Sequence, residues 1–261
     1  TLESELKTKL FVRHANGYLP TDTGRELERI AKVTEDQFDL FSKRIRYNNS
    51  ELEGDFVITS LDILCPLLMP AIRIFQEKHP KVMVNFQSSE DIFKLEYGQA
   101  HVAIRTGSKP TEDDYVCIPF ADFSIGLYAH DSYIEKHGVP KTVEDFHNHY
   151  FVSNTSDSEK PHMYNWLRQY VPAANIRFRC EVRMGQAQAI KAGLGIGLMP
   201  KHEAEMDLSL TRILPEQMWV INNWIITHGD LHRSDKIQAF LDVLKSRDYR
   251  RGLATMLGEQ I

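Results

Sequence analysis

Residues 54–105 decide the fold: they read GDFVIT at 54–59, LCPLLMPAIRIF at 64–75, VMVNF at 82–86 and HVAIR at 101–105. The three short runs rich in β-branched residues predict strands, and residues 64–75 and 92–95 between them have helical spacing. The apolar residues of 64–75 recur at steps of three and four, so they line one helix face that must pack on a sheet. The pattern predicts a βαβαβ unit with a parallel sheet.

Polar residues follow the predicted strands where each strand ends. Right-handed crossovers bring the C-terminal ends of parallel strands to one edge, which would gather Ser60, Ser88, Ser89 and Arg105. Open α/β sheets bind small ligands at such edges, so we expect a ligand site here.

Two prolines fall within the first predicted helix. Only a proline in the first turn is tolerated at little cost, and the helix contains both Pro66 and Pro70. We therefore expect either a helix that begins near Pro66 and kinks before Pro70, the option we favour, or a separate turn formed by the early residues.

The bulk composition is that of an ordinary soluble protein. The chain has 261 residues, of which 42% are hydrophobic and 26% charged. No apolar run approaches the ~20 residues of a membrane span, and the first residues lack the features of a signal peptide, so we predict a cytoplasmic protein. Three scattered cysteines without a CxxC pair argue against a disulfide framework or a thiolate zinc site. The net charge of −5 gives no general nucleic-acid signal.

A second set of alternating elements spans residues 123–222. Strands are predicted at 125–128, 151–152, 176–183 and 196–199, with an amphipathic helical run at 164–170. A helix from Met184 ends at Gly193, and Gly195 and Gly197 then lead into a strand. Because these glycines precede the strand, we do not read them as a dinucleotide-binding loop. A last strand is predicted at 224–228 and a last helix at 234–245.

One long helix is predicted from Thr21 to about Asn48. Its apolar positions recur at steps of three and four and form a narrow seam: Leu27, Ile30, Thr34, Phe38, Phe41 and Ile45. A seam of this width fits a second helix, which predicts dimerisation. Packing of the seam on the chain's own domain is the alternative.

The N-terminal residues carry a spaced pattern of Leu2-Glu3, Leu6, Leu10-Phe11, Arg13 and Thr21-x-x-Gly24. This pattern resembles the end of the winged helix-turn-helix of LysR-type transcriptional regulators, and the glycine-rich turn at 193–199 resembles the most recognisable motif of their effector domain. Lys7 stands where the family usually has glycine, and Thr23 where it usually has alanine. The resemblance extends to about residue 247 and implies that the first DNA-binding helices are missing from this sequence.

The resemblance implies a fold class and a domain organisation. The fold class is α/β: a two-lobed, periplasmic-binding-protein-like effector domain of two Rossmann-like subdomains, preceded by a long linker helix and a partial winged helix-turn-helix. Residues 1–20 would be the remnant of the DNA-binding domain and 21–50 the linker helix and hinge. Residues 51–121 with 223–250 would form the first effector subdomain, and 122–222 the second.

The resemblance also implies the sites. A small-molecule effector would bind between the lobes, at Ser60, Leu61, Asp62, Ser88, Ser89, Arg105, Thr106, Ser153, Asn154, Gly185 and Gln186. A serine-rich site with one arginine favours a carboxylate, although Asp62 could equally be a helix N-cap, and each of these residues could instead serve as a cap or lie in a surface loop. DNA would be contacted by Ser4, Lys7, Lys9, Arg13, His14 and Asn16, for which solvated surface charge is the alternative.

The predicted function is a bacterial DNA-binding regulator whose effector changes the arrangement of a homodimer or homotetramer on operator DNA. The alternatives are a two-lobed binding protein or enzyme without a DNA-binding role, and a regulator without a ligand. We predict no catalytic site, cofactor or metal. His147 and His149 with Asp145 are the nearest approach to a metal site, and we expect both imidazoles to be solvated at the surface. For Cys65 we favour buried packing over a redox role.

Overall fold

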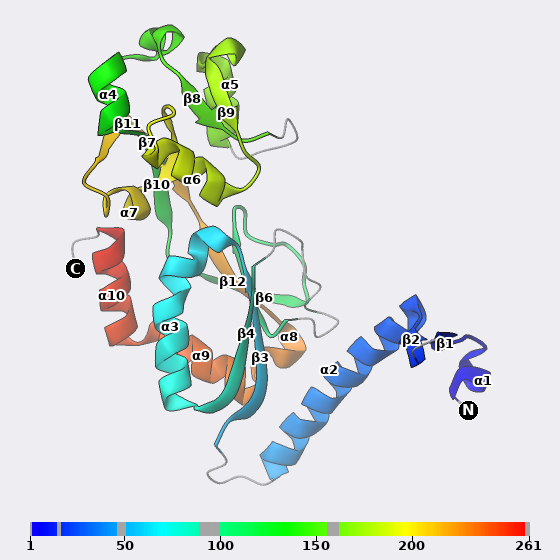
Figure 1. Ribbon diagram of the computed structural model, residues 1–261. Helices are drawn as coiled ribbons and strands as arrows, with labels where there is room; N and C mark the ends of the chain where they lie inside the picture. Colours follow the sequence, from blue (N-terminus) through cyan, green and yellow to red (C-terminus); the bar gives the residue numbers. More distant parts are fainter. Residues whose placement is uncertain are drawn as a thin grey trace. The chain divides into compact units, whose positions relative to one another are not determined.

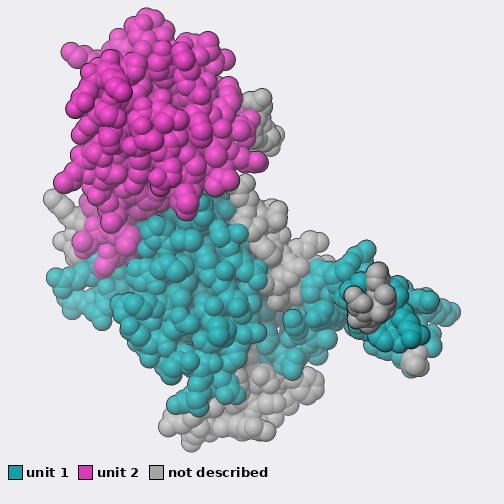
Figure 2. Space-filling view, in the orientation of Figure 1, with its two compact units in different colours: residues 1–120, 223–251 teal, residues 121–222, 252–261 magenta. Residues whose placement is uncertain are grey.

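The computed structural model describes residues 2–14, 17–45, 51–88, 95, 100–155 and 162–258, whose helices and strands are labelled in Figure 1. The side chains of residues 14, 17 and 38–45 lie outside this description. The chain divides into two compact units, coloured separately in Figure 2. Unit 1 comprises residues 1–120 and 223–251, and unit 2 comprises residues 121–222 and 252–261.

The chain begins with a short helix, a hairpin and a long helix. These are α1 (Leu2–Leu6), β1 (Phe11–His14), β2 (Gly17–Pro20) and α2 (Asp22–Ile45). Strands β1 and β2 pair antiparallel, with Arg13 opposite Tyr18. Helix α2 confirms the predicted long helix as far as Ile45, and residues 46–50 lie outside the described part.

The Thr-x-x-Gly motif joins the hairpin to α2. The Thr21 hydroxyl donates to the Lys9 carbonyl at 2.8 Å and accepts the Gly24 N–H at 3.0 Å, as an N-cap does. A Cβ on Gly24 would lie 2.0 Å from the Leu10 carbonyl oxygen. Only glycine lets the first turn of α2 approach this backbone so closely.

Unit 1 contains a five-stranded sheet in the order β4-β3-β5-β12-β6. Its strands are β3 (Glu53–Ser60), β4 (Lys81–Ser88), β5 (Val102–Thr106), β6 (Tyr115–Pro119) and β12 (Asn223–His228). Strand β3 pairs parallel with both β4 and β5, which confirms the predicted parallel sheet. Strand β12 lies antiparallel between β5 and β6.

Besides α1 and α2, the described helices of unit 1 are η1 (Asp62–Leu64), α3 (Cys65–Lys78), α8 (Gly229–His232) and α9 (Asp235–Lys245). Helix α10 (Arg247–Leu257) follows α9 and crosses the boundary between the two units at residues 251–252. Helix α3 begins at Cys65 with Pro66 in its first turn, which confirms the favoured start near Pro66, and it continues through Pro70. The residues directly before it form the separate turn η1, and the kink stays a prediction. The prediction that 234–245 is the last helix is wrong, because α10 follows it.

Three aromatic rings hold α3 and α9 together with the sheet. Phe56 on β3, Phe75 on α3 and Phe240 on α9 are fully buried, with ring centroids 5.2 to 5.6 Å apart. Aromatic pairs at these distances add about 0.5–1.5 kcal/mol each beyond the area they bury. The apolar face predicted for the first helix is therefore confirmed as a core face.

Unit 2 is built from short elements. Its strands are β7 (Phe123–His130), β8 (Phe151–Ser153), β9 (Ile176–Arg179), β10 (Gly197–Pro200) and β11 (Leu210–Ile221). Strands β10, β7 and β11 form an antiparallel sheet in that order, and β8 pairs parallel with β9. The helices are α4 (Asp131–His137), η3 (Val143–Asn148), α5 (His162–Tyr170), η4 (Ala173–Asn175), α6 (Arg183–Lys191) and α7 (Lys201–Ala204). Strand β9 is shorter than predicted, because it ends at Arg179, residues 180–182 form the turn that follows it, and Arg183 already belongs to α6.

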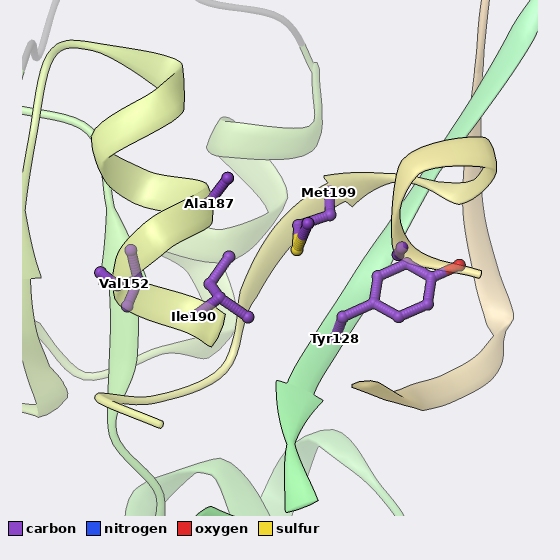
Figure 3. Close-up of a cluster of buried hydrophobic side chains, with 7 residues drawn as sticks. Tyr128, Val152, Ala187, Ile190 and Met199 are labelled. Atoms are coloured by element: carbon purple, nitrogen blue, oxygen red, sulfur yellow. The ribbon is translucent and has the colours of Figure 1, made fainter. Parts of the chain in front are cut away.

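The core of unit 2 lies between α6 and the strands around it (Figure 3). Ile190 and Ala187 from α6 meet Val152 of β8, Met199 of β10 and Tyr128 of β7. The glycine-rich turn makes this packing possible. Gly193 takes a φ of 74° after α6, and a Cβ on Gly195 would lie 2.6 Å from the Tyr150 carbonyl oxygen.

Candidate functional site

The C-terminal edge of the parallel strands in unit 1 carries buried polar side chains. Ser60 ends β3 and is paired in register with Ser88 at the end of β4. Ser88 is exposed, whereas Ser60 is fully buried, and its hydroxyl has no hydrogen-bond partner among the described residues. A buried hydroxyl without a partner costs about 1–3 kcal/mol. The edge therefore holds a polar group that the described chain itself leaves unsatisfied.

Arg105 lies at the same edge, at the end of β5. Its Nη2 donates to the Thr59 hydroxyl at 2.8 Å, and its Nη1 donates to the Ile104 carbonyl at 2.9 Å. Burial lowers the pKa of the Arg105 guanidinium, which nevertheless stays charged at neutral pH. Because side chains alternate along a strand, Thr59 and Ser60 face opposite sides of the sheet. Arg105 is thus held on the side of β3 away from the Ser60 hydroxyl.

The remaining predicted positions in unit 1 surround these two. Leu61 is the residue before η1 and has an extended backbone, and Asp62 is the first residue of η1. The reading of Asp62 as an N-cap is therefore wrong, because Leu61 occupies the cap position without a side-chain bond. Thr106 is half-buried and in register with Asn223 of β12, while Ser89 lies outside the described residues.

In unit 2 Ser153, Asn154 and Gln186 are buried and Gly185 is half-buried, and the hydrogen bonds of Ser153 and Gln186 converge on the backbone of Cys180. Ser153 ends β8, and its carbonyl accepts the Cys180 N–H at 3.0 Å. The Gln186 amide donates to the Cys180 carbonyl at 2.8 Å and accepts the Tyr164 hydroxyl at 3.2 Å. A Cβ on Gly185 would meet the Cys180 Sγ at 2.5 Å. These residues and the buried Asn154 shape the turn between β9 and α6.

Sequence reasoning missed three residues at these edges. Thr59 is fully buried and holds Arg105, and Asn223 is buried at the first position of β12, where its carbonyl accepts the Phe120 N–H at 2.8 Å. Tyr164 holds Gln186. Only Thr59 had a signal in the sequence, since it directly precedes Ser60 at the predicted end of the strand.

The residues predicted to contact DNA lie in α1, the turn after it and β1. Ser4, Lys7, Lys9 and Arg13 are exposed, the side chain of His14 is not described, and Asn16 is outside the described residues. Lys7, which replaces the usual glycine, has a φ of 50° in the left-handed region that glycine adopts most readily. Glu3 accepts the Leu10 and Phe11 N–H groups, bonds that lower the pKa of its carboxyl.

The seam predicted for dimerisation lies on α2. Leu27 is half-buried, Ile30 is exposed, and Thr34 donates its hydroxyl to the Ile30 carbonyl of the same helix. The side chains of Phe38, Phe41 and Ile45 lie outside the description. Of the described apolar residues of the seam, Ile30 is therefore open to solvent in the single chain and Leu27 is partly covered.

The histidine cluster differs from the expectation. His147 is exposed, but His149 is buried, and its Nδ1 lies 3.2 Å from the Tyr133 hydroxyl. The prediction that both imidazoles are solvated is wrong for His149. Burial lowers the pKa of its imidazole, and nearby His137 lowers it further.

Other chemistry is limited in the described part of the chain. Among the described residues no group of three or more acidic, histidine or cysteine side chains is placed to hold a metal ion. The three cysteines are half-buried and free of disulfides, and Cys65 opens α3 instead of lying in the core as predicted. None of the described helices combines the length and apolar character that a membrane span requires.

Comparison with known proteins matches the chain to one family model and to transcriptional regulators. The family model described as "LysR substrate binding domain" matches residues 49–248, which is more than half of the chain. An uncharacterized HTH-type transcriptional regulator of Haemophilus influenzae is 24% identical over 227 residues, covering 82% of this chain and 76% of the relative. The uncharacterized HTH-type regulator YusT of Bacillus subtilis is 24% identical over 260 residues, covering 92% and 82%.

Solved structures with a similar fold include full-length regulators. The virulence activator AphB of Vibrio cholerae, described as a member of the LTTR family, aligns with a TM-score of 0.59 and 20% identity, over 94% of this chain and 86% of that chain. CrgA of Neisseria meningitidis, described as a LysR-type transcriptional regulator, aligns with a TM-score of 0.64 and 18% identity, over 93% and 85%. These alignments support the two-lobed α/β fold class.

Proposed function

The chain belongs to the LysR substrate-binding domain family, and from this premise we propose that its two units together bind a small carboxylate-bearing metabolite that controls a transcription regulator. Residues from both units would contribute: Ser60, Leu61, Asp62, Ser88, Ser89, Arg105 and Thr106 from unit 1, and Ser153, Asn154, Gly185 and Gln186 from unit 2. The proposal combines the family with the polar edges of the two units.

The observation that carries the proposal is the buried, unpaired hydroxyl of Ser60. Folded proteins rarely leave such a group unsatisfied, and a polar ligand would supply its partner. Arg105 stands at the same sheet edge, on the other side of β3 from the Ser60 hydroxyl, so one ligand would reach both only around the end of the strand. Burial lowers the pKa of its guanidinium. A carboxylate is the anion that a guanidinium binds in bidentate geometry.

The proposed regulator acts on operator DNA as a homodimer or homotetramer in the cytoplasm. The open seam with Ile30 at the surface of α2 supports self-association. Exposed Lys9 and Arg13 beside the β1–β2 hairpin support contact with phosphates. Ligand binding would shift the population between two arrangements of the oligomer, in proportion to its differential affinity for them.

A thermal-shift screen of the purified chain against small organic acids, amino acids and aromatic metabolites tests the proposal. A true ligand at 100 times its Kd stabilises the folded chain by about 2.7 kcal/mol. We expect Arg105→Ala to weaken binding of that ligand at least about tenfold, because a charge-assisted hydrogen bond is worth about 1.5–3 kcal/mol. Sedimentation of the same samples with and without ligand reports the change in assembly.

The matched control is Arg73→Ala. Arg73 is an exposed arginine of the same unit that pairs only with Glu77 along α3 among the described residues, so its loss should leave ligand affinity unchanged. If Arg105→Ala bound the ligand with full affinity, the proposal that Arg105 binds a carboxylate of the ligand would be wrong. If no compound in a broad panel stabilises the chain, the result would favour a regulator that works without a small-molecule ligand.

A further inference from the structure

The first turns of α10 carry an arginine-rich surface. Arg247, Arg250 and Arg251 are all exposed, and their spacing of i, i+3 and i+4 puts them on one face of the helix. Tyr249 lies on the opposite side, where its side chain is 3% exposed and its hydroxyl donates to the Leu67 carbonyl of α3 at 2.9 Å. The buried tyrosine therefore holds the start of α10 on unit 1 with its arginine face toward solvent.

The charge of this face is opposite in sign to that of the chain as a whole. Residues 245–251 contain four cationic side chains, of which exposed Lys245 is the first, and one acidic side chain, Asp248, whereas the whole chain has a net charge of −5. The pKa of His232 on α8 is lowered by burial and, in addition, by the charges of Lys245 and Arg233. This part of the surface of unit 1 is therefore electropositive.

The arginines stand at the end of the helix where positive charge is unfavourable. The backbone dipole of a helix places partial positive charge at its N-terminus, and like charges three and four residues apart repel each other. Helices α3, α4, α6 and α9 carry basic side chains in their last turn, where the dipole favours them, and α10 carries none there. The arginine face therefore does not serve the stability of α10.

Cationic residues near the start of other helices are paired with carboxylates. There are three such pairs: Arg25 with Asp22 on α2, Arg183 of α6 with Glu203 at 2.9 Å, and Lys201 with Glu205 on α7 at 3.9 Å. Within the described part of the chain, the guanidinium groups of Arg247 and Arg250 have no carboxylate at ion-pair distance. The chain thus neutralises such charges elsewhere and leaves these two available to an anionic partner.

We propose that the arginine face of α10, formed by Arg247, Arg250 and Arg251 with Lys245 beside it, binds the phosphate backbone of duplex DNA. It would be a second DNA contact, in addition to the one proposed for the N-terminal residues. Guanidinium groups match phosphate oxygens in geometry and charge, and contacts to the backbone carry no sequence information. The choice of DNA as the polyanion rests on the proposed function, which the HTH-type regulators similar to this chain support.

The salt dependence of DNA binding tests the proposal. Fluorescence anisotropy of a labelled duplex of arbitrary sequence gives the binding constant of the full chain over a series of salt concentrations. Each phosphate contact contributes about 0.9 to the slope of log K against log salt, so Arg247→Gln combined with Arg250→Gln should reduce the slope by about 1.8. Arg247→Lys combined with Arg250→Lys keeps both charges and should keep most of the slope.

The matched control is Lys136→Gln combined with Lys141→Gln. These two residues are exposed in unit 2, and their replacement removes the same amount of charge. The control should leave the slope unchanged, and thermal melting of every variant confirms that it is folded. If the arginine pair and the lysine pair change the slope equally, the arginine face is not a DNA contact and the inference is overturned.

Two further measurements separate this inference from its alternatives. A labelled poly-glutamate peptide stands for an acidic protein: if the arginine pair weakens binding of the peptide but keeps the DNA slope, the face fits an acidic protein and the inference is overturned. Lys9→Gln combined with Arg13→Gln tests the N-terminal contact of the proposed function. A loss of slope confined to that variant would support the proposed function and overturn the inference. Absence of duplex binding by the wild-type chain at low salt would also overturn the inference, while the ligand screen still tests the effector site.

Discussion

Two buried polar side chains, one in each unit, lie between a strand and the helix that follows it, and they differ in their hydrogen bonding. Ser60 lies where β3 gives way to η1, and Gln186 lies in the first turn of α6 after β9. Both ends of the Gln186 amide are bonded within unit 2, whereas the Ser60 hydroxyl has no partner among the described residues. A polar residue between strand and helix can thus be bonded within its unit before any ligand arrives or be left for a ligand to satisfy, and its hydrogen bonds distinguish the two cases.

The largest expected effect tests the architectural role of Gln186. Gln186→Ala should lower the free energy of unfolding by about 2–3 kcal/mol, because it removes two hydrogen bonds and leaves the Cys180 carbonyl without its donor. Gln188→Ala, on the exposed side of the same helix, should stay within about 0.5 kcal/mol of the wild type. Denaturant titration measures both, and equal values for the two variants would contradict the architectural role.

A second prediction concerns a buried polar side chain of unit 2 that, unlike Gln186, has no hydrogen-bond partner among the described residues. His202 of α7 is 4% exposed, neither ring nitrogen has a partner among the described residues, and its ring packs edge-on against Phe123 at 5.6 Å. Burial lowers the pKa of His202, Glu203 raises it, and Arg183 lowers it. The net shift is downward, so the folded chain resists a proton that the unfolded chain accepts.

The sign of the pH dependence follows from that shift. The stability contribution of neutral His202 is complete above the ordinary histidine pKa of about 6.5 and is lost as the pH falls from there through the lowered pKa of the folded state. The loss is at most about 1.4 kcal/mol per pH unit. His202→Leu should remove this part of the acid sensitivity in melting curves from pH 7 to 5. His162→Leu, which replaces an exposed histidine of unit 2, should not.

The smallest expected effect concerns Ser60. Without ligand, Ser60→Ala should leave the free energy of unfolding unchanged or raise it by up to about 1 kcal/mol, since it removes a buried polar group without a described partner. Ser88→Ala, at the exposed register partner, should be neutral. A loss of more than about 1 kcal/mol in Ser60→Ala would show that the hydroxyl has a structural partner, and the contrast with Gln186 would disappear.

The regular parts of this fold could be predicted from periodicity alone. Strand β3, helix α3 and the parallel neighbours β4 and β5 follow from apolar spacing, because their burial depends on contacts that repeat along the element. Strand β11 was missed because its register shifts between Ile213 and Met218, where Leu214 takes a φ of 45° and Pro215 follows. An interrupted strand loses the alternation that sequence analysis depends on.

The burial and hydrogen-bond partners of the site residues were harder to predict than their positions in the chain. The partners of Gln186 are Tyr164 and the Cys180 carbonyl, and His149 is buried by contacts with Tyr133 and by the bond from Asn175 to its carbonyl. Apart from the Gln186–Cys180 bond, which spans one turn, these bonds join residues 16 to 26 positions apart and form only after the intervening elements have packed. Local sequence indicates which residues are polar, whereas tertiary packing decides which of them are already bonded.

The position of β12 has a consequence for biosynthesis. Among the described strands, β6 joins the sheet of unit 1 through β12 alone, and β12 follows the whole of residues 121–222 in the chain. A nascent chain on the ribosome can therefore pair β3, β4 and β5 early but cannot finish this sheet until residue 228 has emerged. The strands of unit 2, although they start later, have all emerged once β11 ends at Ile221, so the sheet begun first is the one that waits longest with an open edge.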